Sequence, residues 1–263
     1  MMLGRNEDIQ PAGIALGVGH VVNPFGDSRL AECSATGDEA RVSDLIGSCV
    51  RQDLEHENIF GFTPLIRAVM AGSESIVRIL LERGADPAHA DKDGRTPLIW
   101  AVKRQHAAVL RVLLTHGAPT EARTRYGATA MHEAAMRGCH EAITLLQRHG
   151  AKIDTPNAQD WTPLMLALPR KRLSAAWCLL ELGASVHAMD AAGISVLILA
   201  VRTGDAHLVA ELLRRGADPT VYSLHGPSPL LEASLRRHSI IQALIRDAIF
   251  RKRMMGVDSV RFL

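Results

Sequence analysis

The sequence is poor in aromatic residues, in cysteine and in net charge, and the last two shortages argue against particular classes of protein. Only 4% of its 263 residues are aromatic, and the four cysteines show no Cys-x-x-Cys spacing. We therefore expect reduced thiols in a cytoplasmic or, alternatively, nuclear protein, and not a disulfide-rich secreted scaffold. The net charge of +2 is too small to demand a nucleic-acid partner.

Motifs that carry chemistry are also missing. No stretch approaches the roughly 20 apolar residues that cross a bilayer. His132-Glu133 begins like a zinc-protease helix, but Met136 stands where the second histidine ligand is required. The sequence has no Gly-x-Ser-x-Gly elbow and no phosphate-binding Gly-rich loop. We expect no enzymatic activity, no cofactor and no metal site.

What the sequence does have is a period of 33 residues. One column holds a threonine or serine at a fixed place in each period: Thr63, Thr96, Thr129, Thr162, Ser195 and Ser228. A second column holds Gly-Ala pairs that start at Gly84, Gly117, Gly150, Gly183 and Gly216. Such a fixed interval predicts a protein built from structural repeats.

Each repeat predicts two short helices and a loop. The Thr or Ser is suited to cap a helix whose first residue is often Pro, and Gly72, Gly138 and Gly204 stand about two turns later. An apolar run with helical spacing follows and stops at the Gly of the Gly-Ala pair. The remaining residues, such as 85–93, are rich in turn formers and predict a protruding hairpin or loop. Helices this short are marginal alone, so the repeats must stack into a solenoid.

The segments "DGRTPLIWAV" and "FTPLIRAVMAGSESIVRILLERGADP" resemble ankyrin repeats. The resemblance implies an all-α solenoid of about seven stacked helix-turn-helix units with hairpin loops. The signature histidine occurs only once, as His132, so we expect the hydrogen bonds that this residue makes between neighbouring loops to be largely absent.

Five segments follow from the repeat. Residues 1–26 form an N-terminal extension or cap, and 27–57 a divergent first repeat, with a bulge at "GSCVRQ". Residues 58–222 are five regular repeats, 223–250 a C-terminal capping repeat, and 251–263 a basic tail. The apolar stretch Ile9 to Val22 is interpreted as a cap laid over the first repeat. A targeting segment is the alternative, and the preceding Glu7 and Asp8 count against it.

In ankyrin folds partners usually dock on the hairpin tips and the first helices, and this resemblance locates candidate binding residues. Few aromatic residues are present, yet several fall in these columns. They are Phe60, Phe62, Trp100, Tyr126 and Trp161. Exposed rings anchor interfaces because they bury a large area at low entropic cost. The alternative is that these rings pack between adjacent hairpins as local core.

A row of cations lies in the same columns, mostly at the end of the first helix. It consists of Arg67, Arg95, Lys103, Arg104, Arg137, Arg170, Arg202 and Arg236. Arginine suits forked contacts to carboxylate or phosphate. Favourable interaction with the helix dipole, on a solvated face, is the alternative. Pro169 falls within the first helix of its repeat and should shorten it.

We therefore predict a non-enzymatic adaptor that binds an acidic or acidic-hydrophobic segment of a partner protein, extended or helical, on its concave face. No small-molecule substrate is expected. The alternative is a polyanion, either nucleic acid or an anionic lipid headgroup, bound by the arginine row and by the basic tail from Arg251.

Overall fold

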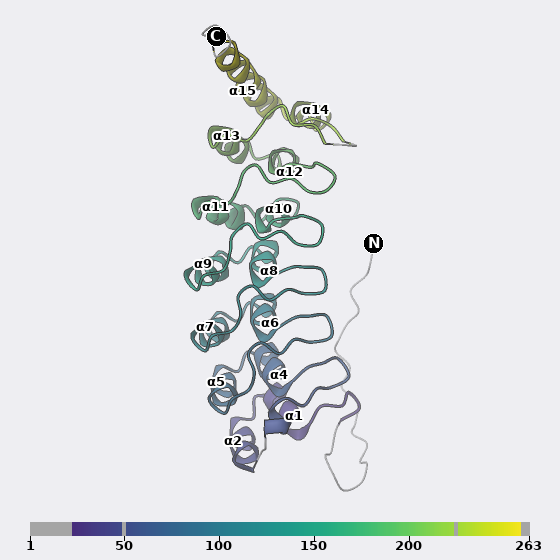
Figure 1. Ribbon diagram of the computed structural model, residues 1–263, viewed down its shortest axis with the longest axis vertical. Coiled ribbons are helices and arrows are strands. Elements are labelled where there is room, and N and C mark those ends of the chain that lie inside the picture. The colour runs from purple at the N-terminus through teal and green to yellow at the C-terminus, as the bar shows by residue number, and fades with distance from the viewer. Residues whose placement is uncertain (1–22, 49–50, 224–225, 259–263) are drawn as a thin grey trace. The chain divides into compact units, whose positions relative to one another are not determined.

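The computed structural model describes residues 23–48, 51–223 and 226–258. The predicted N-terminal cap at 9–22 therefore lies outside the described residues. The chain divides into two compact units, residues 1–122 (unit 1) and 123–263 (unit 2). Each unit is a stack of short helix pairs (Figure 1), and each is described here by itself.

Unit 1 contains three helix pairs and one extra short helix. The pairs are α1 (Arg29–Thr36) with α2 (Glu39–Ser48), α4 (Pro64–Ala71) with α5 (Glu74–Glu82), and α6 (Pro97–Arg104) with α7 (Ala107–Thr115). First helices contact first helices, α1 with α4 and α4 with α6, and second helices contact second helices. The extra helix, α3 (Arg51–Leu54), begins within the predicted bulge at 47–52, of which residues 49–50 are not described.

Unit 2 contains four helix pairs. They are α8 (Ala130–Arg137) with α9 (His140–Arg148), α10 (Pro163–Ala167) with α11 (Leu173–Glu181), α12 (Val196–Thr203) with α13 (Ala206–Arg214), and α14 (Pro229–Leu235) with α15 (Ser239–Asp258). Across both units, the described residues form no strand, and their only β pairing is an isolated bridge between Met189 and Ser195. The prediction of an all-α repeat fold is confirmed.

The helices begin and end where the repeat predicts. Thr63 accepts a hydrogen bond from the Ile66 amide at 3.3 Å, with Pro64 in the first helical turn. Gly72 ends α4 in the left-handed conformation, with φ of 79°. Where a repeat lacks this glycine, another residue is held in the same conformation: Lys171, for example, has φ of 52°. Such a conformation costs an L-residue about 1–2 kcal/mol.

Pro169 shortens its helix, as predicted. Helix α10 has five residues and ends at Ala167, whereas α4, α6, α8 and α12 each have eight. The buried core consists mainly of Ala, Leu, Ile and Val side chains, with Ile66, Leu80 and Leu164 fully buried. Of the helices that the structure describes, none combines the length and the hydropathy that a membrane crossing requires.

Candidate protein-binding surface

Each loop that leads into a first helix of unit 1 is closed at its tip by one side chain. Asn58 Oδ1 accepts hydrogen bonds from the amides of Phe60 and Phe62, both at 2.9 Å. Asp91 Oδ1 accepts from the amides of Asp93 and Arg95 at 2.9 and 2.8 Å. Turns closed in this way hold the local backbone in one conformation. The loop side chains therefore project from a fixed frame.

The same device recurs in unit 2. Thr124, Asn157 and Asp190 each accept from the amides two and four residues later. This column was not among the predicted site residues. A signal for it was present, because Asn58, Asp91, Thr124, Asn157 and Asp190 recur at the repeat interval and all are turn-forming types.

Four aromatic rings of unit 1 form a continuous row. Phe25 and Phe60 have ring centroids 6.2 Å apart, and Phe60 and Phe62 are 5.6 Å apart. Phe62 meets Trp100 edge to face at 5.5 Å. The row is open to solvent near its Phe25 end, because Phe60 and its sequence neighbour Ile59 have 47% and 54% of their surfaces exposed. The other end, at Trp100, is closed.

Trp100 is buried, and the expectation of an exposed ring there is wrong. Only 3% of its surface is exposed, and its indole Nε1 donates to Asp91 Oδ2 at 2.9 Å. The carboxylate that closes the loop tip thus has a second oxygen directed at α6, and the indole fills the space between loop and helix. For this ring the alternative interpretation, local core, holds.

Three cations surround the Trp100 ring. Lys103 Nζ lies 4.2 Å from the ring centroid, and the guanidinium carbons of Arg95 and Arg104 lie 5.4 and 5.7 Å away. Arg95 also pairs with Asp93 at 2.6 Å, so its charge is compensated. Arg104 is exposed and forms no ion pair with any described residue.

Arg67 has a structural role. It pairs at 3.3 Å with Asp27, whose side chain is almost completely buried. Asn58 Nδ2 donates to the other oxygen of Asp27 at 2.9 Å. Arg67 therefore joins α4 to the segment before α1. It was predicted to contact a partner protein, but its guanidinium is already paired within the chain.

The two predicted rings of unit 2 differ in exposure. Tyr126 is 53% exposed, and the Arg125 guanidinium lies 4.7 Å from its ring centroid. Trp161 is half-buried, and its Nε1 donates to Asp190 Oδ2 at 3.1 Å. The backbone carbonyl of Trp161 is 3.0 Å from His132 Nε2. His132 therefore makes the contact between loops that the ankyrin resemblance implies for this position.

Most predicted cations of unit 2 are paired with carboxylates of the same chain. Arg137 meets Glu133 at 2.7 Å, and Arg202 and Arg236 both meet Glu232, at 3.2 and 2.6 Å. Burial alone would raise the pKa of Glu232, but hydrogen bonds from the two arginines lower it below its ordinary value. Arg170 is exposed and has no ion pair among the described residues.

These observations reduce the candidate surface to fewer groups than predicted. In unit 1, the exposed ring of Phe60 contacts Phe62, which contacts Trp100, and the charged ends of Lys103 and Arg104 lie beside the Trp100 ring. We call these five residues the tip patch. In unit 2, Tyr126 and Arg170 are the predicted residues that are exposed and not committed to a carboxylate or to core packing.

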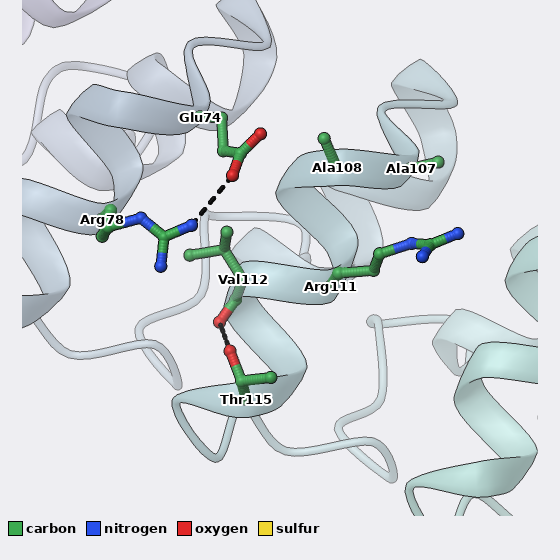
Figure 2. Close-up of a pocket in the computed structure, with 7 residues that line it drawn as sticks. All are labelled: Glu74, Arg78, Ala107, Ala108, Arg111, Val112 and Thr115. Atoms are coloured by element: carbon green, nitrogen blue, oxygen red, sulfur yellow. Dashed lines mark hydrogen bonds and ion pairs between the residues drawn. The ribbon is translucent and has the colours of Figure 1, made fainter.

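A groove on another part of unit 1 contains none of the predicted residues. It has a volume of about 480 Å³ and lies between α5 and α7, lined by Glu74, Arg78, Ala107, Ala108, Arg111, Val112 and Thr115 (Figure 2). Arg78 is paired with Glu74 at 2.8 Å, and Thr115 Oγ1 donates to the Val112 carbonyl at 2.9 Å. Glu74, Arg78 and Thr115 are thus already engaged within the groove, and the tip patch is the better candidate. Among the described residues, no three His, Cys, Asp or Glu side chains are grouped to hold a metal ion.

Comparison with known proteins identifies the repeats. The family described as "Ankyrin repeats (3 copies)" matches residues 30–125 and 116–190, and "Ankyrin repeat" matches residues 192–223. A search of curated protein sequences found no match. The chain is similar to the ankyrin repeat domain of Bcl-3, described as a unique member of the IkappaB family. Their identity is 33% and their TM-score 0.74, over 84% of this chain and 99% of the other. It is also similar to the human ASB11 ankyrin repeat domain, with 30% identity and a TM-score of 0.70, over 83% of this chain and 96% of the other.

Proposed function

The chain belongs to the ankyrin repeat family, whose domains generally mediate protein–protein interactions, and from this premise we propose that it is an adaptor that binds an acidic or acidic-hydrophobic segment of a partner protein. Ankyrin repeat domains are typically non-catalytic, and no family of enzymes is among the matches. The adaptor is accordingly proposed to be non-enzymatic.

The tip patch is the observation that carries the proposal. It places an exposed ring, Phe60, on a row that leads to Lys103 and Arg104. An apolar side chain of the partner can cover Phe60, and a carboxylate can reach the uncompensated Arg104. The charged ends of Lys103 and Arg104 already lie 4.2 and 5.7 Å from the centroid of the buried Trp100 ring. This contact restricts both side chains and so reduces the side-chain entropy that is lost on binding.

A peptide library selected on the folded chain tests this function. We expect the selected peptides to combine acidic and large apolar residues. Arg104→Glu should weaken their binding at least tenfold, and Phe60→Ala should weaken it as well, as measured by fluorescence anisotropy. Arg83→Glu is the matched control, because Arg83 is an exposed arginine at the end of second helix α5. It should leave the affinity unchanged.

Two outcomes would contradict the proposal. The first is selection of neutral or basic peptides, or equal loss of binding in the Arg83→Glu control. The second is binding of a 20-nucleotide single strand or of anionic vesicles in place of peptides. In that case the logarithm of affinity would fall steeply with the logarithm of salt concentration, and the polyanion alternative would stand.

A further inference from the structure

Helix α15 is much longer than the other second helices of unit 2. It spans Ser239–Asp258, 20 residues, against nine for α9, α11 and α13. Its C-terminal part extends beyond α13 and α14 (Figure 1). The cations at 251–253, assigned from sequence to a basic tail, therefore lie on this helix.

One side of α15 faces the rest of unit 2. Ile241 and Ile245 are buried, at 1% and 0% exposure. Lys252 Nζ binds both carboxylate oxygens of Asp218 at 2.7 Å. An α-helix turns about 100° per residue, which places Ile241, Ile245 and Lys252 within about 40° of one another. These three contacts fix the rotation of the helix about its axis.

The opposite side of α15 carries an exposed apolar stripe. Ile240, Phe250 and Met254 are 68%, 62% and 54% exposed. With Ala243 and Asp247 they are spaced by three, four, three and four residues, the spacing by which one helix contacts another in a coiled coil. We call these five residues the α15 stripe. Repeat packing does not use it, because it faces away from Ile241 and Ile245.

Cations flank the α15 stripe on both sides. Arg246 and Arg253 occupy one flank and Arg251 the other, the positions whose charges select the partner in helix pairs. Arg251 pairs with Asp247 inside the stripe. Arg246 and Arg253 are exposed and form no ion pair with the residues that the structure describes. The stripe is thus apolar except for the paired carboxylate of Asp247, and it is flanked by cations on both sides.

We propose that the α15 stripe is a second docking surface, which binds an acidic amphipathic helix of a partner protein. Such a helix would place apolar residues on Ile240, Phe250 and Met254 and glutamates against the flanking arginines. A second copy of the chain fits poorly, because pairing two stripes brings the same arginines together. A bilayer fits poorly, because Asp247 lies within the apolar surface. This surface is additional to the tip patch and does not depend on it.

The probe is a synthetic three-heptad peptide with leucine at the core positions and glutamate at the flanking positions. The same peptide with lysine at the flanks is its control. We expect the full chain to bind the glutamate peptide at least tenfold more tightly than the lysine peptide. Phe250→Asp should weaken this binding at least tenfold, and the double variant Arg246→Glu, Arg253→Glu should reverse the preference between the two peptides.

Two control variants locate the effect. Tyr222→Asp places the same acid at another exposed ring of unit 2, 75% exposed, and should leave the affinity unchanged. Arg104→Glu alters the tip patch and should also leave it unchanged. Because the substituted side chains are exposed, all variants should keep the wild-type circular dichroism spectrum.

Several results would overturn the inference. If Arg104→Glu weakens peptide binding and Phe250→Asp does not, the peptide binds the tip patch. The α15 stripe is then rejected as a docking surface, while the proposed function of the tip patch stands. If the chain forms a dimer that Phe250→Asp dissociates in sedimentation, the stripe binds a second copy instead. If Phe250→Asp abolishes binding to vesicles of phosphatidylserine while neither peptide binds, the stripe is a membrane surface.

Discussion

Asp91 and Trp100 are joined by a hydrogen bond of 2.9 Å from the indole nitrogen to Asp91 Oδ2. The other oxygen of Asp91 holds the loop tip through two amides. One buried carboxylate therefore ties the loop to the helix that follows it. The fold itself therefore requires Trp100. In the proposed function its contribution to binding is indirect, because the charged ends of Lys103 and Arg104 lie beside its ring.

Replacing Trp100 by Phe should therefore destabilise the protein. The variant keeps most of the apolar contact but leaves a buried carboxylate oxygen without its donor, at a cost of about 1–3 kcal/mol. Urea unfolding followed by far-ultraviolet circular dichroism measures this loss. Trp161→Phe, which removes a bond to Asp190 from a half-buried ring, should cost less. Wild-type stability in Trp100→Phe would show that the bond contributes nothing.

His132 supports a second prediction. Its Nδ1 accepts from the Thr129 amide at 3.1 Å, and its Nε2 contacts the Trp161 carbonyl at 3.0 Å, in a fully buried position. The other repeats have Ile, Met or Leu at this position. His132→Leu should nevertheless destabilise the protein by about 1–3 kcal/mol, because a buried amide loses its acceptor. Hydrogen exchange should show faster exchange of the Thr129 amide, and unchanged protection there would refute the explanation.

The fold could be predicted almost entirely from sequence, because short helices with repeated caps have few ways to bury their apolar faces. Even the shortening of α10 followed from Pro169, and the helix ends two residues before it, at Ala167. The candidate site was less predictable. The ion pairs Arg137–Glu133 and Arg236–Glu232 could have been foreseen from their spacing of four residues. The pair Arg67–Asp27 could not, because it depends on how a divergent first repeat folds back on the second.

Aromatic exposure was the other difficulty. The position of a residue within the 33-residue repeat indicates which side of a helix it occupies. It does not indicate whether a neighbouring loop covers that side. Trp100 lies in a first-helix column that the ankyrin resemblance assigns to the binding surface, and in the structure it is covered by Asp91 and Phe62. The length of α15 also escaped prediction, because residues 251–263 lack the Gly-Ala pair that marks the end of the earlier second helices.

Lys171 supports a prediction about backbone conformation. It occupies the place that glycine takes after the first helices α4, α8 and α12, and its φ is 52°. Lys171→Gly removes the cost of a left-handed L-residue, about 1–2 kcal/mol, although greater freedom of the unfolded chain offsets part of it. We expect a net gain of about 0.5–1 kcal/mol in thermal or urea unfolding. Lys171→Ala loses the same charge and keeps the backbone cost, so a gain in Ala equal to that in Gly would contradict the explanation.

The ion pair between Asp218 and Lys252 should make the stability of unit 2 depend on pH in the acidic range. Burial alone would raise the pKa of Asp218, but hydrogen bonds from Lys252 and Thr220 lower it to about 2 from the ordinary value of 3.8. A carboxylate whose pKa is lower in the folded protein stabilises it above the ordinary pKa. That stabilisation is lost as pH falls through the range from the ordinary value to about 2. The pair is partly exposed, so it is worth at most about 1 kcal/mol.

Lys252→Met removes the group that lowers this pKa, and its effect should therefore depend on pH. Near neutral pH the variant should be less stable than the wild type by about 0.5–1 kcal/mol, because the bond between α15 and Asp218 is lost. As pH approaches 2 the wild type loses the same contribution, so the two unfolding curves should converge. Arg253→Met removes an equal charge from α15 without a carboxylate partner among the described residues, and its difference from the wild type should show no such convergence. Urea unfolding at several pH values between 7 and 2 makes the comparison. Parallel loss of stability in Lys252→Met and wild type would mean that the pair does not hold α15 against unit 2.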